Sequence, residues 1–192
     1  ASYRPDITNT PAEPAHVDFA WPHLKQLEAA RTESPAWELS STLKEEEFTR
    51  AVTLGLFDYL RKSRSRGFVV SLSGGADSTA VSCLAAQAVH LATAEIGFDG
   101  LKKKLSFLRG IEAVTDTDEL IKRLLTCVYQ ASSNSSTTTR EAARQMAKVL
   151  GATFHEFNIS ILVDEYTKMV EQGLGRKLSW KTDDIALQNI QA

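Results

Sequence analysis

The stretch that decides the fold is residues 68–78, Phe-Val-Val-Ser-Leu-Ser-Gly-Gly-Ala-Asp-Ser. Its first five residues form a short apolar run of strand-forming residues, which is typical of a strand covered on both faces in a parallel sheet. Two glycines and then the Ala- and Leu-rich residues 79–90 predict a turn followed by a buried helix. A strand, a glycine turn and a helix in this order favour an α/β fold.

The rest of the chain continues this alternation. Apolar runs at 124–129 and 154–159 predict two further strands, each followed by a helix. The repeated order predicts a Rossmann-like α/β fold, with a parallel sheet and helices on both faces. Residues 91–123 are interpreted as an insertion with some helix, and the lysine run at 102–104 as a solvated face.

Capping residues predict where the helices begin and end. Two Thr-x-x-Glu patterns have the spacing of a capping box, in which both side chains satisfy the first turn of a helix. These pairs are Thr42 with Glu45 and Thr138 with Glu141. Gly151 and Gly173 are each expected to end a helix. Thr182 is expected to cap the last helix.

The prolines divide the chain into two parts. All five lie within the first 35 residues, so residues 1–40 are interpreted as a proline-rich linker or lead-in. Residues 41–192 are expected to form a domain that is truncated at its C-terminus, since the last helix has no stop signal before Ala192.

Composition narrows the class of protein. A net charge of −2 and a pI near 6.1 give no global attraction to nucleic acid or to anionic membranes. No apolar run approaches the ~20 residues that a membrane-spanning helix needs. Cys83 and Cys127 lie in segments expected to be buried and lack metal-ligand spacing. We therefore expect a reduced, cytoplasmic setting.

The glycine loop has the properties of an anion site. Glycines let the backbone approach a ligand closely, and the free N–H groups at a helix N-terminus attract negative charge. The hydroxyls of Ser73 and Ser78 add donors. We therefore predict that the loop binds the phosphates of ATP. The candidate residues are Ser71, Leu72, Ser73, Gly74, Gly75, Ala76, Asp77 and Ser78.

A carboxylate in this loop needs an explanation, because it repels phosphate. Asp77 is explained if it holds Mg²⁺, which then bridges to the phosphates. The loop is not a Walker A loop, since no Gly-Lys-Ser/Thr is present in it. The alternative is a tight turn in which Asp77 or a serine only caps the next helix.

The loop resembles the Ser-Gly-Gly-x-Asp-Ser motif of the ATP-pyrophosphatase (PP-loop) superfamily. Three other segments resemble the glutamine-dependent NAD synthetases within it. They are Asp58-Tyr-Leu-Arg-Lys-Ser63, the loop of residues 129–140 with its Asn-Ser-Ser, and residues 186–192, Ala-Leu-Gln-Asn-Ile-Gln-Ala. The resemblance covers roughly residues 43–192.

The resemblance implies ATP-dependent amidation of deamido-NAD to NAD through an acyl-adenylate, with release of AMP and pyrophosphate. It implies ATP and Mg²⁺ as cofactors, Asn189 as a deamido-NAD contact and a homodimer or larger homo-oligomer. Ammonia would come from glutamine through a glutaminase domain that this sequence does not contain. Adenine is expected beside residues 126–129, at the carboxyl edge of the sheet.

The sequence allows other functions for this loop. Another PP-loop ligase, of the tRNA-modifying or GMP synthetase type, would share the loop. An ATP-binding fragment that is inactive as supplied would share it too. Arg140 and Arg144 lie about one helical turn apart and would form surface ion pairs or contact phosphate.

Overall fold

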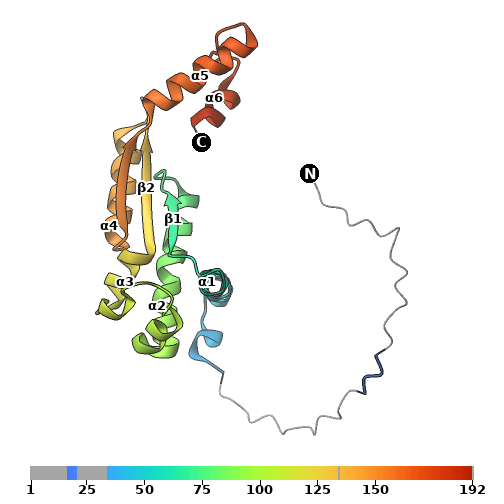
Figure 1. Cartoon of the computed structure of the whole chain (residues 1–192), viewed down its shortest axis with the longest axis vertical. Helices are drawn as coiled ribbons and strands as arrows, with labels where there is room; N and C mark the ends of the chain where they lie inside the picture. The colour runs from blue at the N-terminus through green and yellow to red at the C-terminus, as the bar shows by residue number, and fades with distance from the viewer. Residues whose placement is uncertain (1–16, 21–33, 134, 192) are drawn as a thin grey trace. The chain divides into compact units, whose positions relative to one another are not determined.

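The structure is a computed structural model that describes residues 17–20, 34–133 and 135–191. The chain divides into two units, residues 1–35 and 36–192, and each is considered by itself. The predicted lead-in lies largely outside the described residues. All of the helices and strands described below belong to the second unit (Figure 1).

Three strands alternate with helices along the second unit. The strands are β1 (Phe68–Ser71), β2 (Leu125–Ala131) and β3 (Thr153–Asn158). The α-helices are α1 (Leu43–Ser63), α2 (Ala76–Lys104), α3 (Thr117–Leu124), α4 (Thr137–Val149), α5 (Ser160–Leu174) and α6 (Asp184–Gln191). Two short 3₁₀ helices, η1 (Ala36–Leu39) and η2 (Ile111–Ala113), complete the set.

The strands form one parallel sheet in the order β1-β2-β3. Val70 pairs with Cys127, and Cys127 pairs with Phe154, so the three strands are in register across the sheet. All three carboxyl ends therefore lie at one edge. The predicted α/β class and parallel sheet are confirmed, with strand boundaries within two residues of those expected.

Burial differs between the two faces of the sheet. Helices α2 and α4 pack on the face that carries Cys127 and Tyr129, and both of these side chains are buried. On the opposite face, Val69 is 75% exposed and Phe157 is 53% exposed. The prediction that the first strand is covered on both faces is therefore wrong for the described residues. Successive right-handed crossovers in one direction along a sheet place their helices on the same face.

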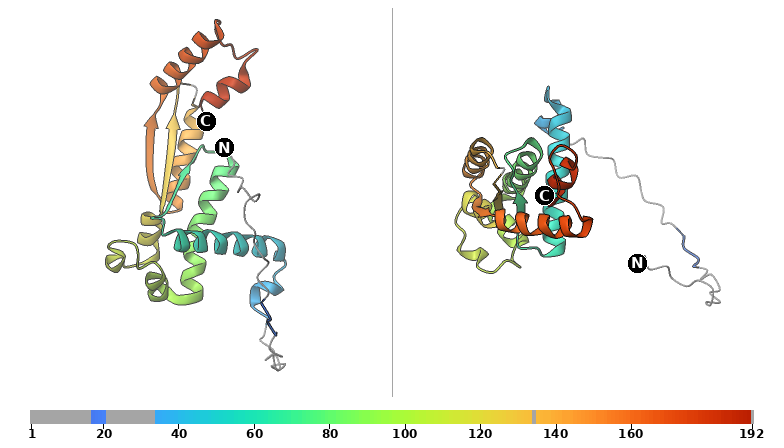
Figure 2. Two further views of the ribbon diagram at one scale, coloured as in Figure 1. Left: turned by 45° about the vertical axis from the view of Figure 1, so that its right-hand side comes forward. Right: turned by 90° about the horizontal axis from the view of Figure 1, so that it is seen from above.

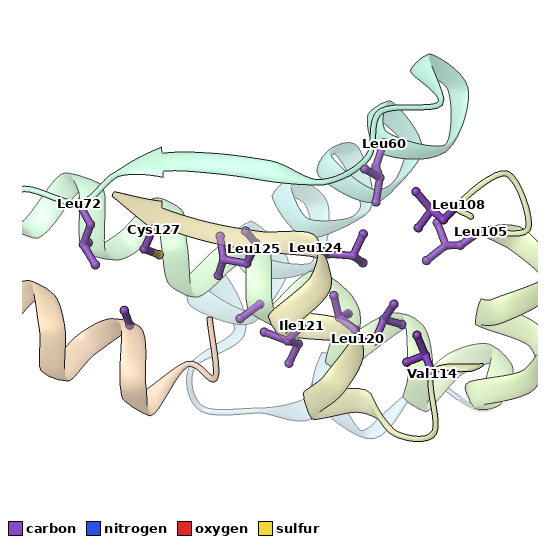
Figure 3. Close-up of a cluster of buried hydrophobic side chains, with 14 of the residues drawn as sticks. Leu60, Leu72, Leu105, Leu108, Val114, Leu120, Ile121, Leu124, Leu125 and Cys127 are labelled. Carbon is purple, nitrogen blue, oxygen red and sulfur yellow. The ribbon is translucent and has the colours of Figure 1, made fainter. Parts of the chain in front are cut away.

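Residues 91–123, which the sequence suggested to be an insertion with some helix, contribute side chains to the core. Helix α2 continues to Lys104 through one non-helical residue, Gly97 (φ 71°, ψ 161°). Beyond it, a cluster of apolar side chains is buried around the start of β2 (Figure 3). These are Leu101, Leu105, Leu108, Ile111, Val114, Leu120 and Ile121. Lys102 is not fully solvated either, since its Nζ donates to the carbonyls of Glu112 (2.9 Å) and Val114 (2.8 Å).

By length and composition alone, α2 would be long and apolar enough to cross a membrane. In this structure it packs against α1, α3, β1 and β2. Contacts of this kind are expected of the central helix of an α/β core, whose apolar faces meet other elements.

The predicted caps are confirmed in part. Thr42 is the N-cap residue of α1 as predicted, but its hydroxyl bonds to the Ser40 hydroxyl and no side chain caps the helix. Ser136, and not Thr138, caps α4 by accepting from the Thr139 N–H (3.1 Å). The stop at Gly151 is confirmed by its φ of 69°. Helix α5 ends at Gly175 (φ 66°) and not at position 173.

The last helix begins one residue later than predicted, after Asp183 instead of Thr182. The Asp183 carboxylate accepts from both terminal nitrogens of Arg176 (2.6 and 3.0 Å) and from the Ser179 N–H (3.0 Å). It also accepts from the Thr182 hydroxyl (2.8 Å). These bonds, led by the one from Arg176, hold the pKa of the Asp183 carboxyl well below its usual range.

We predict that Asp183 fixes the corner between α5 and α6. Asp183→Asn should increase amide hydrogen exchange in residues 176–190 at neutral pH, because the amide loses the charge that pairs with Arg176. Because the pKa is lowered in the folded state, this stabilisation is present above the unfolded value of about 3.9 and is lost as the pH falls below it. The exposed neighbour Asp184 provides the control, and Asp184→Asn should leave exchange at the wild-type level. Equal exchange in both variants would contradict this role.

Candidate functional site

The loop after β1 is positioned by the sheet. The Leu72 N–H donates to the Val128 carbonyl (2.8 Å), which extends the pairing of β1 with β2 by one residue. The Leu72 side chain is 0% exposed and anchors the chain in the core. The next residues leave the sheet at its carboxyl edge, where ligands of open α/β sheets bind. Gly74 makes the turn with a φ of 82°, a conformation that disfavours other residues.

Hydroxyl groups hold the loop in a closed shape. The Ser73 and Ser78 hydroxyls lie 3.1 Å apart, and the Ser73 N–H donates to Ser78 Oγ (3.2 Å). The Gly75 N–H in turn donates to Ser73 Oγ (3.3 Å). The two serines that begin and end the motif therefore meet across the glycines. Both hydroxyls can still turn toward a ligand, because a hydroxyl proton rotates.

The N-terminus of α2 has no side-chain cap. Gly75 occupies the N-cap position, and the first α2 bond runs from the Thr79 N–H to the Gly75 carbonyl (3.3 Å). The N–H groups of residues 76–78 precede this bond and so lack a helical acceptor. By contrast, the N-terminus of α4 is capped by Ser136. Helix α2 therefore presents free donors and a positive dipole at the carboxyl edge of the sheet.

The loop touches the first turn of α4. A Cβ atom at Gly74 would lie 2.5 Å from the carbonyl oxygen of Thr139 and 3.1 Å from its carbonyl carbon. At Gly75, the nearest atom to such a Cβ would be Ser73 Oγ, at 3.3 Å. Gly74 is therefore required for a close backbone approach as well as for its positive φ. The contact brings the N-termini of α2 and α4 together.

Asp77 lies in the first turn of α2, is exposed and forms no hydrogen bond or ion pair with the described residues. Its carboxylate is free to take a ligand, which argues against the interpretation that it merely caps the helix. Among the described residues, no cluster of three His, Cys, Asp or Glu side chains could hold a metal. One carboxylate fits Mg²⁺, which binds through one or two carboxylates together with phosphates and water.

The other predicted residues have different surroundings. Ser71 ends β1 and donates from its hydroxyl to Gln130 Oε1 (3.1 Å). Asn189 lies on an exposed side of α6, opposite the buried Leu187. Figures 1 and 2 show α5 and α6 beyond the carboxyl ends of the strands, at the end of the sheet where the loop lies. The role of Asn189 stays a prediction.

The arginines of α4 form ion pairs. Arg140 Nε lies 3.1 Å from Glu156 Oε1, and Arg144 contacts the same carboxylate (2.9 Å) as well as Glu141 (3.1 Å). Of the two possibilities that the sequence left open, the structure shows surface ion pairs. Cys127 is buried, which raises the pKa of its thiol, whereas Cys83 is only partly buried.

The sequence analysis placed Tyr129 near the adenine and Thr139 in the loop of residues 129–140, but it did not foresee that their side chains meet. The Tyr129 hydroxyl lies 2.9 Å from Thr139 Oγ1, and the Thr139 backbone contacts Gly74. The contact could have been anticipated from the sequence. Tyr129 lies near the end of a buried strand, and the hydroxyl of a buried tyrosine requires a polar partner.

Comparison with known proteins identifies the family. A family model described as NAD synthase matches residues 48–192. The chain belongs to the NAD synthase family. A crystal structure of a glutamine-dependent NAD(+) synthetase from Cytophaga hutchinsonii is similar, with 38% identity and a TM-score of 0.70. The similarity covers 78% of this chain and 27% of that one.

Full-length relatives in the NAD synthase family are much longer. The human glutamine-dependent NAD(+) synthetase is 31% identical over 215 residues, covering 100% of this chain and 29% of the human protein. The glutamine-dependent NAD(+) synthetase of Oryza sativa subsp. indica is 29% identical over 209 residues, which cover 100% of this chain and 28% of the Oryza protein. The chain therefore spans less than a third of the length of these relatives.

We predict that alanine at the two loop glycines has unequal effects. Gly74→Ala should destabilise the fold by about 2 kcal/mol or more, because the methyl meets the Thr139 carbonyl at positive φ. Gly75→Ala should cost less than about 1 kcal/mol, since its φ of −89° is allowed. Urea denaturation of both variants measures the difference. Equal losses would show that the contact with α4 does not constrain the loop.

Proposed function

We propose that this chain binds the triphosphate of ATP at residues 73–78 and serves the amidation of deamido-NAD to NAD. The observation that carries the proposal is the glycine loop leading into the uncapped N-terminus of α2. Membership in the NAD synthase family supports the substrate. It also favours deamido-NAD over the substrates of other PP-loop ligases.

The proposed reaction has two steps. A nicotinate carboxylate oxygen of deamido-NAD attacks the α-phosphorus of ATP, an O–P bond forms, and the bond to pyrophosphate breaks. Ammonia then attacks the acyl carbon, AMP leaves and one proton is released. The protein must therefore bring together two polyanions and stabilise the charge on pyrophosphate as it leaves.

The loop residues match this demand. The N–H groups of residues 76–78 and the hydroxyls of Ser73 and Ser78 are donors for phosphate oxygens. Asp77 would hold Mg²⁺, which supplies positive charge between the phosphates. Asn189 is proposed to contact deamido-NAD. A homodimer or larger homo-oligomer in the cytoplasm is proposed as the working form.

We expect Asp77 to carry the magnesium dependence of ATP binding. In the wild type, ATP with Mg²⁺ should raise Tm more than ATP with EDTA. In Asp77→Asn the two should give the same shift, because the metal ligand is lost. Asp99→Asn is the control, since it removes the same charge from an exposed position near the other end of α2. A wild type that ATP does not stabilise would refute the phosphate site.

The substrate is tested by exchange of labelled pyrophosphate into ATP, which requires no ammonia. We expect exchange to depend on added deamido-NAD, because its carboxylate accepts the adenylyl group reversibly. Xanthosine monophosphate, the carbonyl substrate of a GMP synthetase, should give none. Exchange supported by xanthosine monophosphate and not by deamido-NAD would contradict the proposed substrate.

A further inference from the structure

Tyr129 connects the core of the sheet to the candidate site. It lies on β2, is 4% exposed and faces the same side of the sheet as Cys127. Its hydroxyl reaches Thr139 Oγ1 (2.9 Å) in the first turn of α4. The ring therefore packs in the core, while the hydroxyl contacts a polar group at the carboxyl edge.

Thr139 is held from a second direction by Ser136. Its N–H donates to Ser136 Oγ (3.1 Å), and its hydroxyl donates to the Ser136 carbonyl (3.1 Å). The Thr139 hydroxyl also lies 3.0 Å from Ser136 Oγ. In the pair that it forms with Tyr129, either hydroxyl can be the donor, because hydroxyl protons rotate. Tyr129, Thr139 and Ser136 are therefore linked by a continuous set of hydrogen bonds.

The carbonyl of Thr139 faces the loop. Gly74 approaches it so closely that the position of the first turn of α4 limits where the loop can lie. The loop's own hydrogen bonds, between Ser73, Gly75 and Ser78, stay within residues 73–78. They fix the shape of the loop. Leu72 anchors the start of the loop to β2 through its bond to Val128, and the contact with Thr139 limits where Gly74 can lie.

We propose that Tyr129 and Thr139 are positioning residues for the phosphates of ATP, acting through the backbone contact between Thr139 and Gly74. This inference rests on the proposed function, because it takes residues 73–78 as the phosphate site. Neither side chain needs to touch ATP. Their hydrogen bond holds the N-terminus of α4 against the loop and so keeps the donors of α2 in place before ATP binds. Preorganised donors bind an anion more tightly than donors that must first be ordered.

The test measures ATP affinity and loop protection in parallel. Tyr129→Phe removes the hydroxyl and keeps the ring, and Thr139→Val removes the other hydroxyl at nearly constant volume. Each should weaken binding of ATP with Mg²⁺ by about fivefold, as expected for one lost hydrogen bond. Each should also raise amide hydrogen exchange in residues 73–78. The double variant should be no worse than Thr139→Val alone, because Thr139→Val already removes the bond to Tyr129 together with the hydroxyl contacts to Ser136.

Two further variants separate positioning from general stability. Thr139→Ser keeps the hydroxyl and should restore most of the affinity. Tyr166→Phe, at an exposed tyrosine of α5, should change neither affinity nor exchange. The inference is overturned if Tyr129→Phe lowers Tm but leaves both ATP affinity and exchange in residues 73–78 at wild-type values.

Amide hydrogen exchange in the unliganded protein tests the positioning role separately from ATP binding. If the wild type does not bind ATP, the proposed function fails. Exchange in residues 73–78 of the unliganded protein then decides whether Tyr129 positions the loop. Unchanged exchange in Tyr129→Phe would overturn the positioning role as well.

Discussion

The close approach of Gly74 to the carbonyl of Thr139 is the constraint on which the site depends. It places the N-termini of α2 and α4 side by side at the carboxyl edge of the sheet. Parallel pairing of β1 with β2 brings the two loops to the same edge, and the glycine allows them to touch. Any side chain at position 74 would force the loops apart. The free donors of α2 would then no longer lie in a fixed place.

The contrast between the two helix starts explains why one of them is suited to a ligand. Ser136 satisfies the first turn of α4 from within the protein. At the start of α2, the corresponding position is Gly75, which has no side chain to do so. The serines of that loop bond mainly to each other and leave the N–H groups of residues 76–78 without an acceptor. A phosphate would satisfy those groups, as anions commonly do at helix N-termini.

The sequence predicts features that depend on local chemistry. The turn at Gly74, the strand before it and the helix after it follow from residue types within a dozen positions. Tertiary features were harder to predict. An apolar run such as Phe68–Leu72 looks the same for a strand covered on one face or on two, so the exposure of Val69 was missed. Glycines and lysines at 97–110 suggested an insertion, although Leu101, Leu105 and Leu108 within it are buried in the core.

Family membership and site geometry support the same function by separate routes. The NAD synthase match covers residues 48–192 and does not depend on how the loop is shaped. The geometry of residues 73–78 would indicate an anion site even without a known family. The hydrogen bond between Tyr129 and Thr139 adds a link between the core and this site that neither the motif nor the family match contains.

The central claim is that residues 73–78 hold the phosphates of ATP. The most direct measurement is a titration with ATP and Mg²⁺ followed by the backbone amide signals in nitrogen-15 NMR spectra. We predict that the largest shifts fall on residues 73–79, since their N–H groups would donate to the phosphates. Shifts confined to another surface, such as the groove lined by Lys168, Arg176 and Lys177, would contradict it.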